Sequence, residues 1–178
     1  MRSFEERLKG GHPNSLGNTI EVVEEVLNDN HHFDELFNCY FSDDELVRLR
    51  VSSAVKRVCI SKKEMVIPYI DILLKKVSKI DQASTQWTLA LLFQMLEDDM
   101  NEEQLAESKA ILRRNLENHK DWIVLNNSME TLYHWLEKDS QLKQWLQKLL
   151  KKLTSDSRKS VSKRAMKLLK KLSEQENT

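Results

Sequence analysis

Glycine and proline are scarce in the sequence, and their positions limit the possible folds. The three glycines all fall within residues 1–17, and the two prolines are Pro13 and Pro68. A β-rich fold needs glycine-containing turns between its strands, and a phosphate-binding loop needs several glycines so that the backbone can approach the phosphate. The chain after residue 17 therefore excludes P-loop and dinucleotide-binding fingerprints, and it favours an all-α fold.

Cysteines and long apolar runs are also few. Cys39 and Cys59 each lie in an apolar helical pattern, which predicts buried free thiols in a reducing compartment. The longest nearly apolar run, residues 88–96, is far too short to cross a bilayer, and no basic-then-apolar signal segment opens the chain. We therefore expect a cytoplasmic protein with no membrane partner.

Catalytic and metal-binding motifs are missing. The sequence contains neither a His-Glu-x-x-His motif nor a Gly-x-Ser-x-Gly elbow. Glu130 and His134 are four residues apart, a spacing that can hold a metal ion on one helix face. A metal site in a helical bundle needs further ligands on facing helices, and no second such pair occurs. We therefore expect no metal, no cofactor and no catalytic residue, and we interpret the pair as a polar contact.

Helix-start signals are frequent in this chain of 178 residues, of which 40% are hydrophobic and 31% charged. In a capping box, the side chain of the first residue accepts a hydrogen bond from the backbone N–H three residues later. The side chain of that later residue in turn accepts from the backbone N–H of the first residue. Four pairs have this spacing: Asn18 with Glu21, Ser42 with Glu45, Ser61 with Glu64, and Asn101 with Gln104. Asp121 and Asp139 are further candidate caps.

These signals and the apolar periodicity predict nine helices within one domain. We place them at about residues 19–28, 32–41, 43–60, 63–79, 82–97, 102–118, 121–137, 140–153 and 157–173. Pro68 either kinks the fourth helix or marks a later start for it. We expect a single domain at residues 18–173 and a disordered tail at residues 174–178. Residues 1–17 form an N-terminal arm that is either flexible or, through Phe4 and Leu8, a short cap on the first helices.

One amphipathic pattern recurs along the chain. The stretch "DDELVRLRVSSAVKRV" at residues 43–58 superposes on three later segments, with anchor positions at Val47, Thr85, Val124 and Val161. The anchors are separated by 38, 39 and 37 residues. Near-constant spacing of amphipathic helices is typical of a solenoid of antiparallel helical hairpins, here right-handed with about four repeats. An irregular helical bundle is the alternative.

The stretch at residues 43–58 resembles the second helix of HEAT repeats. That helix has an acid, then Val-Arg, then a small residue and Leu seven and eight positions after the Val. The matching residues here are Asp44, Val47, Arg48, Ala54 and Val55, whereas the other copies carry Gln86, Leu125 and Ser162 at the Arg position. The resemblance covers about residues 33–172. It implies a HEAT-like solenoid whose second helices line a concave face, and it names no function because such repeats serve different roles.

Equivalent positions in the aligned copies of the repeat, which we call columns, indicate a candidate binding surface. Positions seven residues apart share a helix face, and on this basis the concave surface comprises Arg48, Trp87, Asn126, Tyr133, Lys163 and Lys170. The outer surface of the first copy adds Arg50, Lys56 and Arg57. The alternative for Trp87 and Tyr133 is that they only pack between adjacent repeats.

Charge is segregated although the net charge is zero. The net charge is −8 for residues 1–45, +7 for residues 46–80, −6 for residues 81–138 and +7 for residues 139–178. Clustered basic residues attract phosphates or acidic protein surfaces, and they also serve as a solvated helix surface. The charge pattern therefore leaves both kinds of partner open, and it leaves the oligomeric state open.

We consider two main functions for such a chain. The first is a non-enzymatic scaffold that holds a protein or peptide partner on its concave face. The second is nucleic-acid binding through basic concave and C-terminal surfaces, because some DNA glycosylases that act on alkylated purines are built from HEAT-like repeats and use a concave face with Trp, Asp and Arg. Trp122 is followed by Ile123 and Val124 rather than by paired arginines, so we assign to this chain no catalytic residue of those glycosylases. A lyase or chaperone-like protein that handles a cofactor is a third possibility, supported only by the Trp and Tyr content.

Overall fold

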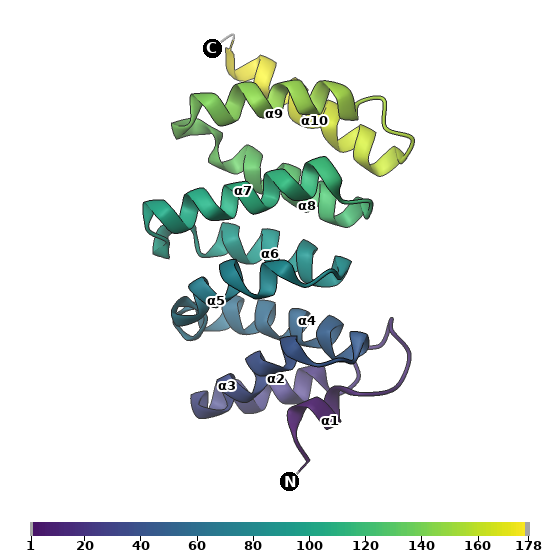
Figure 1. Ribbon diagram of the computed structural model, residues 1–178, viewed down its shortest axis with the longest axis vertical. Helices are drawn as coiled ribbons and strands as arrows, with labels where there is room; N and C mark the ends of the chain where they lie inside the picture. The colour runs from purple at the N-terminus through teal and green to yellow at the C-terminus, as the bar shows by residue number, and fades with distance from the viewer. Residues whose placement is uncertain (1, 177–178) are drawn as a thin grey trace. The chain divides into compact units, whose positions relative to one another are not determined.

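Every regular element of the described chain is a helix. The computed structural model describes the backbone of residues 2–176 and the side chains of residues 2–136 and 139–174, and that range contains helices and no strand (Figure 1). The chain divides into two compact units, which we call the N-terminal unit (residues up to Glu107) and the C-terminal unit (residues from Ser108). The absence of strands among the described residues confirms the all-α prediction.

The described residues form ten α-helices rather than the nine predicted. They are α1 Phe4–Leu8, α2 Thr19–Asn28, α3 Phe33–Asn38, α4 Glu45–Ser61, α5 Ile70–Lys75, α6 Ala83–Met95, α7 Glu102–Asn118, α8 Trp122–His134, α9 Ser140–Leu153 and α10 Lys159–Glu176. Seven short 3₁₀ segments connect or extend them: Asn30–His32, Cys39–Phe41, Lys63–Met65, Ile67–Tyr69, Val77–Lys79, Glu97–Asp99 and Trp135–Lys138. The additional helix is α1, in the segment whose structure the sequence left open.

Pro68 breaks the helix that was predicted over residues 63–79. It lies in the 3₁₀ segment Ile67–Tyr69, and the α-helix begins only at Ile70. Proline has no N–H to donate and its ring collides with the preceding turn, so a regular helix is stable only after it. The later start is therefore the correct alternative.

The predicted capping boxes have mixed outcomes. The box at Asn101 and Gln104 is confirmed, with bonds of 2.9 and 3.0 Å in the two directions. The prediction for Ser42 and Glu45 is wrong because Asp44 caps α4, accepting from the N–H groups two and three residues on at 2.8 and 3.3 Å. Asp121 and Asp139 cap α8 and α9 as expected, whereas Asn18 makes no cap bond.

The core of each unit uses the columns that the repeat predicted. In the N-terminal unit, α4 packs against α2 and α6, and all five core positions of the first copy are fully buried: Val47, Val51, Ala54, Val55 and Val58. The equivalents on α6 and at its C-cap are also buried: Thr85, Leu89, Leu92, Phe93 and Leu96. Apolar burial of this kind stabilises by about 25 cal/mol per Å², and it explains why these columns contain no charged side chain.

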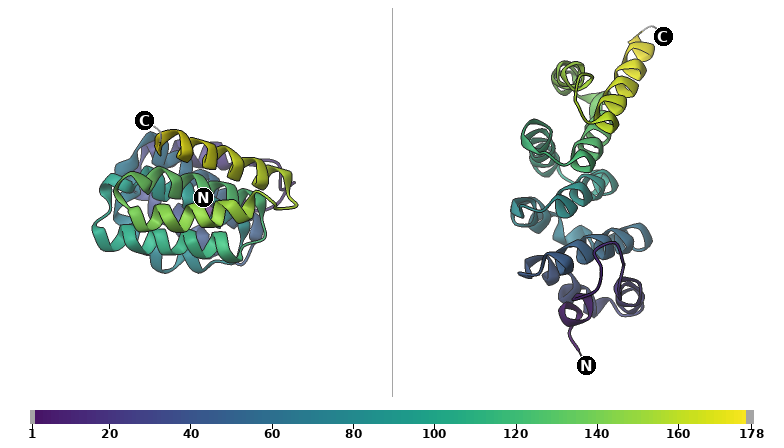
Figure 2. Two further views of the ribbon diagram at one scale, coloured as in Figure 1. Left: turned by 90° about the horizontal axis from the view of Figure 1, so that it is seen from above. Right: turned by 90° about the vertical axis from the view of Figure 1, so that its right-hand side faces the viewer.

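The C-terminal unit is built from the last part of α7 with α8, α9 and α10. Helix α10 packs against both α8 and α9, and Figure 2 shows α9 and α10 side by side. Val161, Ala165, Leu168 and Leu172 of α10 are buried as predicted, whereas Leu169 is only half-buried. Helix α10 continues to Glu176, so the predicted disordered tail is helical at residues 174–176, while residues 177–178 lie outside the described range.

Both cysteines are buried and unpaired, as expected. Burial raises the pKa of Cys39 to about 12 and that of Cys59 to about 11. A thiol is nucleophilic as the thiolate, so neither side chain has the character of a catalytic cysteine at neutral pH. Within residues 2–176, no helix combines the length and apolar character needed to cross a membrane.

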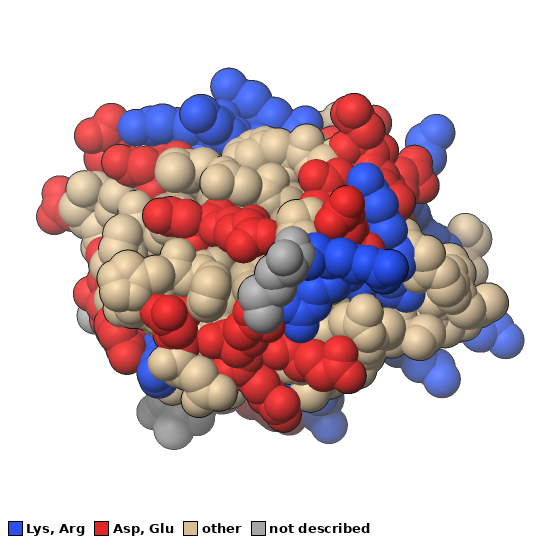
Figure 3. Space-filling model, turned by 90° about the horizontal axis from the view of Figure 1, so that it is seen from below, with Lys and Arg blue, Asp and Glu red and all other residues tan. Residues whose placement is uncertain are grey.

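Acidic side chains such as Glu21, Asp34 and Asp43 are exposed in the N-terminal unit. Figure 3 shows one face of the molecule, on which acidic groups are interspersed with uncharged side chains and basic groups. Helices α1–α3 belong to the part of the sequence with a net charge of −8. The acidic block predicted from the sequence is thus a surface feature of the N-terminal unit.

Candidate functional site

Arg50 was a predicted binding residue, and the structure corrects this. The side chain is only 2% exposed, because its guanidinium points into the loop of residues 9–18, which we call the arm loop. It donates to the carbonyl oxygens of Leu8 and Gly10 at 2.6 Å each, of Ser15 at 3.3 Å and of His12 at 3.5 Å. The five-donor geometry of arginine suits it to collecting several carbonyls at once. Arg50 therefore holds the arm loop onto α4 and is not available to a partner.

The N-terminal segment is a folded cap on the first helices. Phe4 and Leu8 of α1 are buried, and α1 contacts α3 and α4. Arg7 forms an ion pair with Glu25 of α2 at 2.6 Å. Within residues 2–17, α1 thus packs on the first helices, as the capping alternative describes.

Gly17 provides a direct test of the Arg50 contacts. It has a φ of +52°, and a Cβ added there would lie 2.8 Å from the guanidinium carbon of Arg50. Gly10 has a φ of +73° but has no atom within 4 Å of an added Cβ. Alanine at Gly10 should destabilise by about 1 kcal/mol through the backbone alone, whereas alanine at Gly17 should destabilise by about 3 kcal/mol because it also displaces Arg50. Urea unfolding of the two variants measures this difference, and equal losses would contradict the contact.

Arg48 is also committed to contacts within the N-terminal unit. Its Nε donates to Gln82 Oε1 at 2.7 Å, and one terminal nitrogen donates to the carbonyl of Ser42 at 2.6 Å. Gln82 immediately precedes α6, so these bonds tie the start of α6 to α4. Arg48 is therefore a structural residue whose donors are occupied within the unit.

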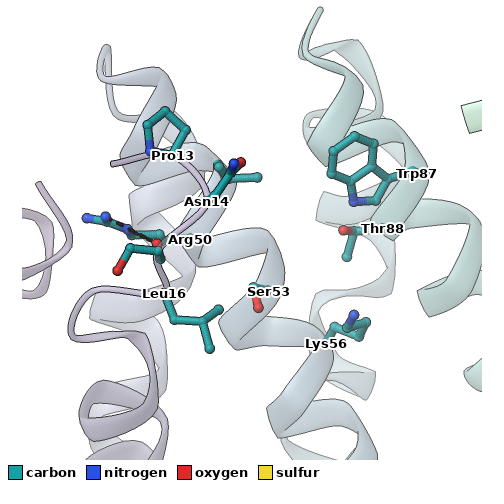
Figure 4. A pocket seen from close by; sticks show the side chains of 10 residues that line it. Pro13, Asn14, Leu16, Arg50, Ser53, Lys56, Trp87 and Thr88 are labelled. Atoms are coloured by element: carbon teal, nitrogen blue, oxygen red, sulfur yellow. Dashed lines mark hydrogen bonds between the residues drawn. The ribbon is translucent and has the colours of Figure 1, made fainter. Parts of the chain in front are cut away.

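Lys56 and Trp87, both candidate binding residues from the sequence, line one hollow. This α4–α6 hollow has a volume of about 190 Å³ and lies between α4, α6 and the arm loop. Figure 4 shows Trp87 and Thr88 on one side, residues of the arm loop opposite, and Lys56 at the end of the gap. Its lining comprises Pro13, Asn14, Ser15, Leu16, Leu49, Arg50, Ser53, Lys56, Trp87 and Thr88. Trp87 is half-buried, so it both packs on neighbours and presents an aromatic wall.

Arg57 lines a second hollow on the other side of α4. This α2–α4 hollow has a volume of about 280 Å³ and is lined by Ile20, Val23, Glu24, Arg57, Ile60 and Ser61. Ile60 is 68% exposed and Ile20 is 37% exposed. Large apolar side chains that are exposed to solvent on neighbouring helices mark an interaction surface. Single exposed apolar residues scattered over a surface do not.

The outer face of α4 separates the two hollows. Leu49, Ser53, Lys56, Arg57 and Ile60 recur at helical spacing, so they share the side of α4 opposite its core columns. Neither Lys56 nor Arg57 makes a hydrogen bond or ion pair with any side chain or backbone group that the structure describes, and Arg57 Nε is buried without an acceptor. We define the α4 face as this row together with the two hollows.

The candidates in the C-terminal unit form no comparable arrangement with one another. Asn126 is buried, with its Oδ1 lacking a hydrogen-bond donor among the described residues, and Tyr133 lies beneath Lys171 at 5.7 Å. Lys163 and Lys170 are exposed, and Lys170 pairs with Glu174 one turn away at 3.8 Å. Buried Asn126 is therefore unsuited to a surface contact, and the two lysines have the character of a solvated helix face.

Glu130 and His134 do not build a metal site. Glu130 forms an ion pair with Arg164 of α10, and this pair accounts for the position of the carboxylate. Among the described residues, no group of three or more His, Cys, Asp or Glu side chains is arranged to hold a metal ion.

Sequence reasoning missed the apolar members of the α4 face. Leu16 of the arm loop is 42% exposed, and with Ile20 and Ile60 it surrounds the two unpaired cations. Ile60 had a recognisable signal, since it follows Ser53 and Lys56 at helical spacing in a row of otherwise polar outer positions. Leu16 had none, because its position depends on how the arm loop folds.

No protein-family model, curated protein or solved structure matches the chain.

Proposed function

We propose that the chain is a non-enzymatic binding module that holds a peptide segment of a partner protein on the α4 face. The observation that carries the proposal is the exposure of three large apolar side chains, Leu16, Ile20 and Ile60, around unpaired Lys56 and Arg57. Apolar anchors that enter small pockets, with polar groups beside them, are the usual source of binding energy in protein interfaces.

A HEAT-like solenoid is the architecture we propose for this module. Support comes from the near-constant spacing of the four anchor positions and from the burial of the same columns on α4, α6, α8 and α10. In the N-terminal unit, α4 packs directly on α2 and α6, which fits successive second helices of such repeats.

A peptide fits the α4 face better than a small molecule or a nucleic acid. The hollows of about 190 and 280 Å³ are smaller than the roughly 300–1,000 Å³ of small-molecule sites. Arg48, a cation of the concave surface considered for nucleic-acid binding, is engaged with carbonyl and amide oxygens of the chain itself, and so is its neighbour Arg50 with carbonyl oxygens. Side chains of an extended or helical peptide can enter two separate hollows, one on each side of α4.

Selection from a random peptide display library on the immobilised chain tests this function. We expect selected peptides to lose binding by at least about tenfold when Ile60 is changed to Asp, because the apolar anchor site becomes charged. Met166→Asp is the matched control, since Met166 is 49% exposed on α10 and outside the α4 face. The proposal fails if the library yields no specific peptide, or if Met166→Asp removes binding and Ile60→Asp does not.

A further inference from the structure

The α4–α6 hollow has an uncompensated positive charge. Two of its lining residues, Arg50 and Lys56, are cations, and none of the described lining residues is a carboxylate. All acceptors of Arg50 are carbonyl oxygens, so its charge is solvated by dipoles and is not neutralised by an anion. A concave surface lined by positive charges concentrates anions near it.

Several other cations of the N-terminal unit are paired with carboxylates. Ion pairs join Arg7 to Glu25 and Lys63 to Asp99, each at 2.6 Å, and Lys9 to Glu5 at 3.1 Å. No described carboxylate lies within ion-pair distance of Lys56 or Arg57, although Glu24 lines the same hollow as Arg57. Lys62, Lys76 and Lys79 also lack such a partner, but they line neither hollow. Lys56 and Arg57 lie side by side on the surface that also exposes Ile60.

Arg57 Nε is the most specific sign of a missing acceptor. This donor is shielded from solvent and has no hydrogen-bond acceptor among the described residues. A buried unpaired donor is unfavourable by about 1–3 kcal/mol. A carboxylate bound on the α4 face relieves this with a charge-assisted bond once the Arg57 side chain turns its guanidinium outward.

We propose that the segment bound on the α4 face is acidic, with carboxylate side chains that pair with Lys56 and Arg57 and apolar side chains that enter the two hollows. This rests on the proposed peptide-binding function and specifies its ligand. Trp87 and Leu49 supply the apolar wall beside Lys56, and Ile20 and Ile60 supply it beside Arg57. The occupant is a segment of another protein, although the acidic block of residues 1–45 makes a second copy of this chain an outcome that the experiment must distinguish.

The composition of the selected peptides is the first measurement. Peptides that bind the chain and lose binding with Ile60→Asp should be enriched in Asp and Glu next to large apolar residues, relative to the starting library. Peptides that depend on Ile60 but are neutral or basic would overturn the acidic ligand and leave the peptide-binding function intact. The two proposals therefore fail in different ways.

Charge reversal at Lys56 is the second measurement. For a fluorescent synthetic peptide with the most enriched sequence, Lys56→Glu should weaken binding by about tenfold, and the loss should shrink as salt rises. A matched peptide with Lys in place of its acidic residues should bind Lys56→Glu better than wild type. Lys79→Glu is the control, because it makes the same charge change at an exposed position of the N-terminal unit outside both hollows.

Three results would overturn the acidic-segment proposal. The first is equal weakening by Lys56→Glu and Lys79→Glu, which would indicate only a general charge effect. The second is concentration-dependent self-association in analytical ultracentrifugation that Lys56→Glu abolishes, which would assign the surface to a second copy. The third is displacement of the peptide by single-stranded DNA at physiological salt, with Lys56→Glu removing DNA binding.

Discussion

Replacing Arg50 with methionine is expected to lower the free energy of unfolding of the N-terminal unit by about 3 kcal/mol. Methionine retains part of the aliphatic volume of the side chain but removes every donor that holds Leu8, Gly10, His12 and Ser15. The arm-loop carbonyls can turn to water after this change, whereas the Leu8 carbonyl lies in a buried bond. Urea unfolding followed by circular dichroism measures the loss.

Arg2→Met is the control for Arg50→Met. Arg2 is exposed in the same N-terminal segment, and its replacement should change stability by less than about 0.5 kcal/mol. Arg50→Lys should fall between the two, because one ammonium group retains the charge but cannot reproduce the planar fork of donors. If Arg50→Met unfolds at the same urea concentration as wild type, the arm loop is not held by this side chain.

A chain shortened to begin at Asn18 should lose about 5 kcal/mol of stability in the N-terminal unit. The loss combines the burial of Phe4 and Leu8 with the hydrogen bonds of Arg50 to the arm loop. A lowered melting temperature would identify residues 2–17 as an integral cap, and an unchanged one would identify them as a loose tail.

The truncation and Arg50→Met should also be strongly non-additive. Both changes remove the same hydrogen bonds, so once the arm is absent the guanidinium of Arg50 is hydrated and methionine at position 50 has no remaining arm contact to remove. We expect the double variant to be more stable than the sum of the two losses predicts, by about 2 kcal/mol. Simple additivity would contradict a shared contact between Arg50 and the arm.

The helices of this chain were predictable where local pattern alone determines them. Val47, Val51 and Ala54 recur at helical spacing, and all three are fully buried in the structure. Asp44 illustrates the limit of local rules, because Ser42 had the better capping-box spacing. The Ser42 hydroxyl instead accepts from the Asp44 N–H and donates to Glu5 of α1, a contact across the fold that no spacing rule detects.

Arg50 shows why the candidate site was only partly predictable. It follows Val47 by three residues and precedes Ala54 by four, which places it beside the core columns. Its charge suggested a surface position, yet the arm loop covers it with carbonyls from residues 35 to 42 positions earlier in the chain. Lys56 and Trp87 were both candidate binding residues chosen from helix period and repeat spacing, and in the structure they line one hollow.

Amide hydrogen exchange with and without a selected peptide tests the central claim, that the chain holds its partner on the α4 face, most directly. Exchange is sensitive to local opening, so bound segments become protected even where no helix changes shape. We predict slower exchange in the arm loop, in α2, along α4 near Ile60 and at the start of α6, with little change in α9 and α10. Protection confined to α8, α9 and α10, with the arm loop and α4 unaffected, would contradict it.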